Sequence, residues 1–271
     1  MRQANVLVHI WLAGVAALAA GCGHVAPEPQ AQGVPRDRSG PLRVAAASDL
    51  QRILPRLLER FQTSGGTTAE ATFGASGQLA EQIKAGAPFD LFLSANRKYV
   101  AELDAVRLIV PGSMRDYARG TLVLCLNSSA GPDVKSLADL GRPEIRKIAI
   151  AHPDYAPYGV AARQALERAG LWASLESKIV RAESVRQAMT YVENGDAEAA
   201  LGSKALADAP GIRTIDVDPA LHDPLIQAMG IVAASGQRDR ARALADFLVS
   251  NEGQAMLAEG GFASAQGKTG H

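Results

Sequence analysis

The chain has 271 residues, and its 28 Lys and Arg residues balance its 28 Asp and Glu residues. This balance excludes a strongly basic surface, so we expect no nucleic-acid partner. The part that follows the N-terminal segments is roughly 230 residues long, enough for one large domain or for two lobes with separate cores.

The N-terminus has the features of a bacterial lipoprotein signal. Met1 and Arg2 give a short basic start, residues 6–20 are almost wholly apolar, and the residues just before Cys22 are small. We expect residues 1–21 to be removed and Cys22 to be lipidated, which would hold the exported protein on a membrane. An ordinary secretory signal or a transmembrane helix is the alternative. Residues 22–41 are rich in Pro, Gly and polar side chains, so they are predicted to form a flexible tether.

Strand-like and helix-like segments then alternate. Apolar strands are predicted at 42–48, 67–74 and 89–95, each followed by a helical segment. Pro55 is expected to bend the first of these helices. The order of strand and helix predicts an α/β fold around mostly parallel sheets.

A second set of elements begins at the apolar segment 121–127, which contains Cys125. Cys125 is the only cysteine after Cys22, so we expect a buried, unpaired thiol. Strands are predicted at 147–153 and 178–184, with helices after them from about Tyr158 and Val185. A C-terminal helix is predicted from apolar residues at helical spacing, namely Ala241, Leu244, Ala245 and Leu248.

Four strand-to-helix turns each have a hydroxyl-bearing residue where the predicted helix begins. Ser48, Ser76, Tyr158 and Ser184 each lie where a predicted helix begins, and Ser48 and Ser184 have glutamine three residues later, the spacing of a capping box. Each serine alone is explained as an ordinary helix cap. Four helix N-termini at strand ends together favour an anion site, because they present backbone N–H groups and partial positive charge.

A serine hydrolase is the alternative from another functional class. The segment Gly74-Ala75-Ser76-Gly77 is one residue short of a nucleophile elbow, and His152 or His222 would have to act as the base. The incomplete motif argues against this, and neither a metal-ligand spacing nor a phosphate-binding loop is present. We therefore expect no enzyme activity and no cofactor.

Several segments resemble one family over residues 42–262. They include "VAAASDL", "FGASGQLAEQIKAGAPFDLFLSA", "YARGTLVLCLN" and "AHPDYAPYGVAARQALERAG", in that order. The chain resembles the periplasmic molybdate-binding proteins of bacterial ABC transporters. The resemblance implies the two-lobed type II periplasmic binding-protein fold, with each lobe a mixed, mostly parallel sheet flanked by helices and with molybdate or tungstate in the cleft between lobes.

The resemblance also implies which residues bind the oxyanion. Ser48 and Ser76 match positions that supply hydroxyls, Val185 matches a backbone N–H donor, and Tyr158 lies where some members place a tyrosine. Many members have a second-lobe tyrosine at the position of Leu201, so Tyr158 is expected to replace that donor. The metal would be held only through the oxygens of its oxyanion.

Asp49 is the ambiguous residue of this set. A carboxylate that faced the cleft would repel a dianion but could accept a proton from hydrogen phosphate or hydrogen arsenate. We expect its side chain to point outward and only its backbone N–H to contribute.

The expected lobes are residues 42–122 plus 224–271, and residues 123–223, with the hinge at the crossovers near 121–127 and 225–235. The resemblance implies a monomer that closes on the anion and docks on a membrane permease driven by a separate ATPase. Another tetrahedral oxyanion, such as sulfate, phosphate or arsenate, or a different solute such as a metal cation, is the alternative ligand.

Overall fold

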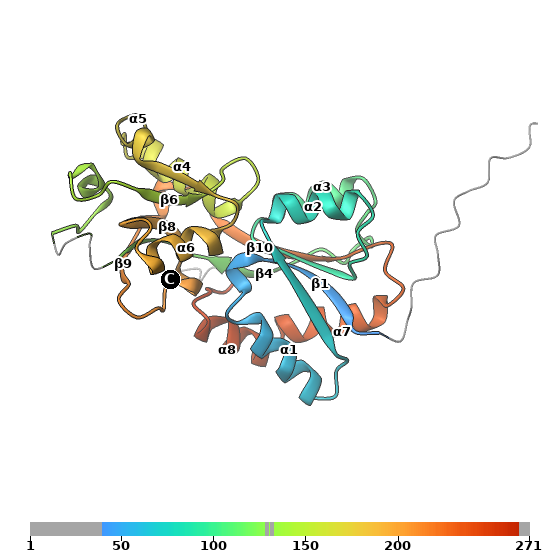
Figure 1. The fold of residues 1–271 in the computed structure, drawn as a ribbon. Helices are drawn as coiled ribbons and strands as arrows, with labels where there is room; N and C mark the ends of the chain where they lie inside the picture. The colour runs from blue at the N-terminus through green and yellow to red at the C-terminus, as the bar shows by residue number, and fades with distance from the viewer. Residues whose placement is uncertain (1–39, 128–129, 131–132, 266–271) are drawn as a thin grey trace, which may run out of the picture. The chain divides into compact units, whose positions relative to one another are not determined.

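The computed structural model describes residues 40–127, 130 and 133–265 (Figure 1). The predicted signal, Cys22 and nearly all of the predicted tether lie outside this part of the chain. Within it, no helix combines the length and the apolar character that crossing a membrane requires.

The described residues form ten strands and eight α-helices, joined by turns and short 3-10 helices such as η1 (Ser48–Leu50) and η5 (Lys204–Leu206). In chain order the strands and α-helices are β1 (Leu42–Ala47), α1 (Leu54–Thr63), β2 (Ala69–Gly74), α2 (Ser76–Lys84), β3 (Leu91–Ser94), α3 (Arg97–Ala105), β4 (Arg115–Gly120), β5 (Leu122–Leu126), β6 (Ile148–Ala151), α4 (Pro157–Arg168), α5 (Trp172–Leu175), β7 (Ile179–Ala182), α6 (Val185–Asn194), β8 (Ala199–Ser203), β9 (Arg213–Asp216), β10 (Leu225–Ile231), α7 (Arg238–Val249) and α8 (Asn251–Glu259).

The first sheet has the strand order β2-β1-β3-β10-β4. β1 is parallel to both β2 and β3, whereas β10 is antiparallel to β3 and β4. Ala47 pairs with Gly74, so the carboxyl ends of β1 and β2 lie side by side. The turns that follow these strands therefore meet at one edge of the sheet.

The second sheet repeats this arrangement with the order β7-β6-β8-β5-β9. β6 is parallel to β7 and β8, and β5 is antiparallel to β8 and β9. Ala151 pairs with Ala182, which aligns the carboxyl ends of β6 and β7. Each sheet has two parallel and two antiparallel strand pairs, so both sheets are mixed, and the predicted α/β class is confirmed.

Helices cover both faces of the first sheet (Figure 1). α1, α7 and α8 share one apolar cluster with β1, and α2 and α3 share another with β3. In α1 the buried residues recur at helical spacing, with Leu54, Leu57, Leu58 and Phe61 against the sheet. The second sheet forms a single apolar cluster with α4 and α6, and this cluster contains the buried Cys125. The expectation of a buried, unpaired thiol is confirmed.

The chain passes between the sheets at two places. Only Thr121 separates β4 of the first sheet from β5 of the second, and the chain returns in the segment between β9 and β10. The predicted lobe boundaries at 122/123 and 223/224 stay a prediction.

Two local predictions are wrong. Pro55 lies in the first turn of α1 and starts this helix instead of bending it, because a first-turn residue needs no N–H donor. Ser48 caps no helix: it is the first residue of η1, and Ala47 occupies the cap position without a side-chain hydrogen bond. The cap at Ser184 is confirmed, since its hydroxyl accepts from the Gln187 N–H at 3.2 Å.

Candidate functional site

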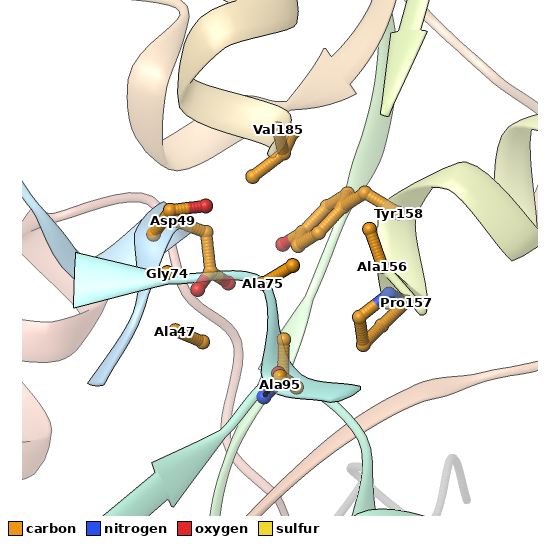
Figure 2. Close-up of a pocket in the computed structure, with 11 residues that line it drawn as sticks. Ala47, Asp49, Gly74, Ala75, Ala95, Ala156, Pro157, Tyr158 and Val185 are labelled. Carbon is orange, nitrogen blue, oxygen red and sulfur yellow. Dashed lines mark hydrogen bonds between the residues drawn. The ribbon is translucent and has the colours of Figure 1, made fainter. Parts of the chain in front are cut away.

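The carboxyl ends of the parallel strands surround a small cavity (Figure 2). The volume open to the centre of a water molecule is about 10 Å³, which leaves room for a molecule of few atoms. Residues from both sheets line it: Ala47, Ser48, Asp49, Gly74, Ala75, Ser76, Ala95, Ala156, Pro157, Tyr158 and Val185. The cavity thus lies where binding sites of open α/β sheets form.

The structure brings all five predicted site residues to this cavity. Ser48, Asp49 and Ser76 come from the ends of β1 and β2, and Tyr158 and Val185 come from the first turns of α4 and α6. Each of the five is at most 5% exposed. Any solute held here is largely removed from water, so its polar atoms must find partners on the protein.

Ser76 is oriented by a neighbouring strand. Its hydroxyl oxygen accepts a hydrogen bond from the Ala95 N–H at 3.0 Å, just beyond the end of β3. Because a hydroxyl carries one proton, this contact leaves that proton to be donated elsewhere. Ser76 is also the first residue of α2, so the N–H groups of the first turn accompany its hydroxyl.

Three α-helices begin at the cavity. α2, α4 and α6 start at Ser76, Pro157 and Val185, and each is at least nine residues long. The first N–H groups of a helix have no acceptor within the helix, and the helix dipole adds partial positive charge there. The cavity therefore combines N–H donors from both sheets' helices with the hydroxyls of Ser48 and Ser76.

The remaining wall residues are small and uncharged. Ala47, Ala75, Ala95 and Ala156 are buried there, Gly74 is half-buried, and none of the lining residues is Lys, Arg or His. Small side chains let the backbone come close to a bound solute. Among the described residues, no group of His, Cys, Asp and Glu could hold a metal ion directly.

A backbone hydrogen bond joins the two sides of the site. The Gly77 N–H donates to the Tyr155 carbonyl oxygen at 2.9 Å. A Cβ atom on Gly77 would lie 2.7 Å from that oxygen and 2.9 Å from the Tyr155 Cβ. Only glycine fits this close approach without displacement of backbone.

Asp49 differs from the expectation. Its side chain does not point outward: the residue is 0% exposed and lines the cavity. The reason is local, because Asp49 belongs to the short η1 that lies buried beneath the site, and not to the exposed first turn of a long helix. Burial raises the pKa of its carboxyl group to about 6, although hydrogen bonds from Gln227 and Tyr158 work in the opposite direction.

Three buried residues that sequence reasoning missed, Gln227, Tyr117 and Ser203, form hydrogen bonds at this site. Gln227 of β10 donates from its side-chain amide to Asp49 Oδ2, and its amide oxygen accepts from the Tyr117 hydroxyl at 2.7 Å. On the other side of the site, the hydroxyls of Ser203 and Tyr158 lie 3.0 Å apart. A glutamine within the apolar segment "LIQAMGI" is the one sequence signal that could have indicated this network.

The predicted role of the Tyr158 hydroxyl as an anion donor stays a prediction. Its ring lines the cavity, while the hydroxyl contacts Ser203 and is turned toward Asp49 (Figure 2). Burial and the nearby Asp49 carboxylate raise the pKa of Tyr158 well above its usual value, so the phenol stays protonated. Leu201, at the position of the absent tyrosine, is fully buried within β8.

Comparisons with known proteins identify the family. The family model described as bacterial extracellular solute-binding protein matches residues 42–263. The chain is 32% identical over 213 residues to the molybdate-binding protein ModA of Azotobacter vinelandii, with 76% of this chain and 83% of the relative covered. The chain belongs to the bacterial extracellular solute-binding protein family.

Two further similarities support the assignment. The putative ABC transporter substrate-binding lipoprotein YvgL of Bacillus subtilis (strain 168) is 28% identical over 224 residues, which cover 82% of this chain and 85% of the relative. The structure of the Azotobacter vinelandii periplasmic molybdate-binding protein superimposes with a TM-score of 0.77 at 29% identity, covering 82% and 98% of the two chains. This solute-binding protein therefore has the type II periplasmic binding-protein fold.

Membership of this family excludes the hydrolase alternative, because its members bind solutes outside the cytoplasm and are not enzymes. The contacts of His152 and His222, the two candidate bases of a hydrolase, are consistent with this conclusion. His222 Nδ1 lies 2.8 Å from the Asp223 carbonyl oxygen, and the His152 ring stacks on Tyr155. The Ser76 hydroxyl oxygen instead accepts a hydrogen bond from the Ala95 N–H at 3.0 Å.

Proposed function

We propose that this solute-binding protein captures molybdate or tungstate outside the cytoplasm and delivers it to an ABC permease with its ATPase. One observation carries the proposal: a cavity of few-atom size is lined by hydroxyls and helix N-termini and by no basic side chain. The names of the relatives, ModA among them, supply the choice of molybdate.

Neutral donors suit a transported dianion. Helix N-termini and hydroxyls stabilise negative charge through directed hydrogen bonds, and burial strengthens these bonds. The absence of a lysine or arginine in the lining means that the anion can leave without breaking an ion pair. The proposed ligands are the Ser48 and Ser76 hydroxyls and backbone N–H groups in the first turns of α4 and α6, including that of Val185.

The proposed mechanism is closure of two lobes. The division into residues 42–122 plus 224–271 and residues 123–223 is supported by the distribution of strands between the two sheets. In this proposal the first lobe binds the anion through Ser48 and Ser76, and closure brings Tyr158 and Val185 against it. The Gly77–Tyr155 hydrogen bond then forms part of the closed interface.

The proposal places the protein on a membrane through a lipid on Cys22, as a monomer. The small residues before Cys22 and the name of the Bacillus relative, a lipoprotein, support this. Replacing Cys22 with Ser should release the protein from the membrane fraction without altering binding.

Another tetrahedral oxyanion is the second candidate, and Asp49 is the observation that favours it. A carboxylate in the cavity could accept the proton of hydrogen phosphate or hydrogen arsenate. Sulfate, which carries no such proton, would be distinguished by cavity size.

Calorimetric titration of residues 41–271 with molybdate, tungstate, sulfate and phosphate tests the proposal. We expect tight, nearly equal binding of molybdate and tungstate and no measurable heat with sulfate. The Ser48→Ala/Ser76→Ala variant should bind molybdate at least about a hundredfold more weakly, because each hydrogen bond to a charged group contributes about 1.5–3 kcal/mol.

Ser174→Ala is the matched control. The Ser174 hydroxyl is exposed and donates to the Leu171 carbonyl oxygen at 3.0 Å, away from the cavity residues, so this variant should bind like the wild type. Phosphate binding without molybdate binding would favour the second candidate. Unchanged molybdate affinity in the double variant would contradict the proposed site.

A further inference from the structure

Asp49 presents a problem that the proposed function does not resolve. Its carboxyl group is fully buried at the wall of a cavity proposed to hold a dianion. An ionised Asp49 would repel that anion, and the low local dielectric would make the repulsion strong. The arrangement of hydrogen bonds around the carboxyl group shows how the conflict can be removed.

The two carboxyl oxygens of Asp49 differ in their contacts. Oδ2 accepts from the Gln227 amide, whose orientation is fixed because its oxygen accepts from the Tyr117 hydroxyl. Oδ1 is buried and has no hydrogen-bond partner among the described residues. Burying an unpaired carboxylate oxygen is costly, whereas a protonated Oδ1 would be a hydrogen-bond donor on a residue that lines the cavity.

Within the described part of the chain, no Lys, Arg or His side chain forms an ion pair with Asp49. The titratable groups against it are the phenols of Tyr117 and Tyr158, which burial keeps protonated. Two elements that follow strands of the second sheet, α6 and η5, pack against η1. Arg186 of α6 pairs with Glu193, and Lys204 of η5 pairs with Asp216. The nearby Arg52 pairs with Asp208.

We propose that Asp49 is a proton-bearing member of the anion site, which takes up one proton when the dianion binds and donates a hydrogen bond to it from Oδ1. This inference rests on the proposed function. The proton comes from solvent or buffer, bonds to Oδ1 and stays there, so the anion remains a dianion. Two negative charges are then held by a site whose lining is wholly neutral.

The pKa of Asp49 in the ligand-free protein is compatible with this step. Burial raises the pKa of Asp49 to about 6, so the group is mostly ionised at pH 8 and half protonated near pH 6. A bound dianion raises this pKa further, because it disfavours the ionised form. Proton uptake should therefore rise from about 0.5 per anion at pH 6 to about 0.9 at pH 7 and approach one at pH 8.

Affinity should follow the same linkage. Each anion that binds above pH 6 must also bring a proton to Asp49, so molybdate affinity should fall as the pH rises. Between pH 6.5 and pH 8 we expect a loss of about twentyfold. Hydrogen phosphate held by an ionised Asp49 would instead require no net protonation of the carboxyl group.

The experiment is molybdate titration of the wild-type protein by calorimetry at pH 6.5, 7 and 8, in two buffers of different ionisation enthalpy. The difference between buffers gives the number of protons taken up. Asp49→Asn, whose amide also donates but does not titrate, should bind molybdate more tightly than wild type at pH 8, without proton uptake and without pH dependence.

Asp154→Asn is the matched control, because Asp154 follows His152 near the site but its side chain is 77% exposed. This variant should retain the proton uptake and the pH dependence of the wild type. Wild-type binding without proton uptake, or with the same affinity at all three pH values, would overturn the inference while leaving the proposed function intact. Loss of molybdate binding in a folded Asp49→Asn protein would overturn it as well. No molybdate binding by the wild type would remove the proposed function, and the inference with it.

Discussion

At the scale of single residues, Asp49 imposes a cost on the folded protein. Its pKa is raised from 3.8 to about 6 because burial disfavours the ionised form. Because the pKa of Asp49 is raised in the folded state, the contribution of this group to stability is greatest below pH 3.8. That contribution is lost as the pH rises through about 6. Converted at about 1.4 kcal/mol per unit of pKa, the difference corresponds to ~3 kcal/mol.

Asp49→Asn should therefore be more stable than the wild type by ~3 kcal/mol at pH 8, and the difference should shrink as the pH falls toward 4. Urea unfolding at both pH values, in the absence of anions, measures this. Asp154→Asn serves again as control and should show no such gain. An equal effect of Asp49→Asn at both pH values would mean that ionisation of Asp49 is not the cause.

The sequence was informative about most residues that line the cavity and gave the wrong orientation for the Asp49 side chain. Ser48, Ser76 and Tyr158 lie at strand-to-helix turns, which the pattern of strands and helices predicts, whereas Val185 was taken from the family resemblance. The direction of the Asp49 side chain depends instead on η1 being a short 3-10 helix, which the spacing of residues 48–51 does not reveal. Ser203 and Tyr117 were missed because their partners are distant in sequence.

At the scale of elements, the first turn of α2 controls how closely the two sides of the site can approach. The Gly77 N–H contacts the Tyr155 carbonyl oxygen directly, and an added Cβ would lie 2.7 Å from that oxygen. This contact is made by a helix that also carries Ser76. In the proposed mechanism, one helical turn therefore couples anion binding to the approach of the two sides.

Gly77→Ala should weaken molybdate binding by about tenfold or more, because the closed arrangement would have to open by a few tenths of an ångström. Stability of the ligand-free protein should change by less than about 1 kcal/mol, as alanine is favoured within helices. Calorimetry and urea unfolding separate the two effects.

Gly141→Ala is the appropriate control, since nothing lies within 4 Å of its added Cβ. It should bind like the wild type. Equal affinity of the Gly77 and Gly141 variants would show that the Gly77–Tyr155 contact is unnecessary for binding.

Strands were predicted correctly where their burial requires a run of apolar residues in the sequence. The apolar strands β1, β3, β5 and β6 were expected from their composition. β9 (Arg213–Asp216) was not predicted, because it is an edge strand whose residues are mostly exposed and carry no apolar alternation. Pro55 was misjudged because its effect depends on where α1 begins, and helix starts are set by tertiary contacts as well as by sequence.

At the scale of the whole molecule, the cavity is formed by segments that follow strands of two different sheets and are distant from one another in the sequence. Ala47, Ala75 and Ala95 from the strand ends of the first sheet belong to the apolar cluster of the second. The sequence could predict two sets of alternating strands and helices, and the family resemblance implied that they form two lobes with a cleft between them. The size of the cavity follows from packing between these sets and could not be derived from residue patterns.

The position of the bound anion tests the account most directly. Crystals grown with molybdate and measured at the molybdenum absorption edge would locate the metal by its anomalous scattering. We predict one strong peak in the cavity, with the anion oxygens within about 3 Å of the Ser48 and Ser76 hydroxyls and the Val185 N–H. A peak at a surface site, for example beside Arg52, Arg56 and Lys204, with this cavity lacking one, would contradict the neutral-donor site.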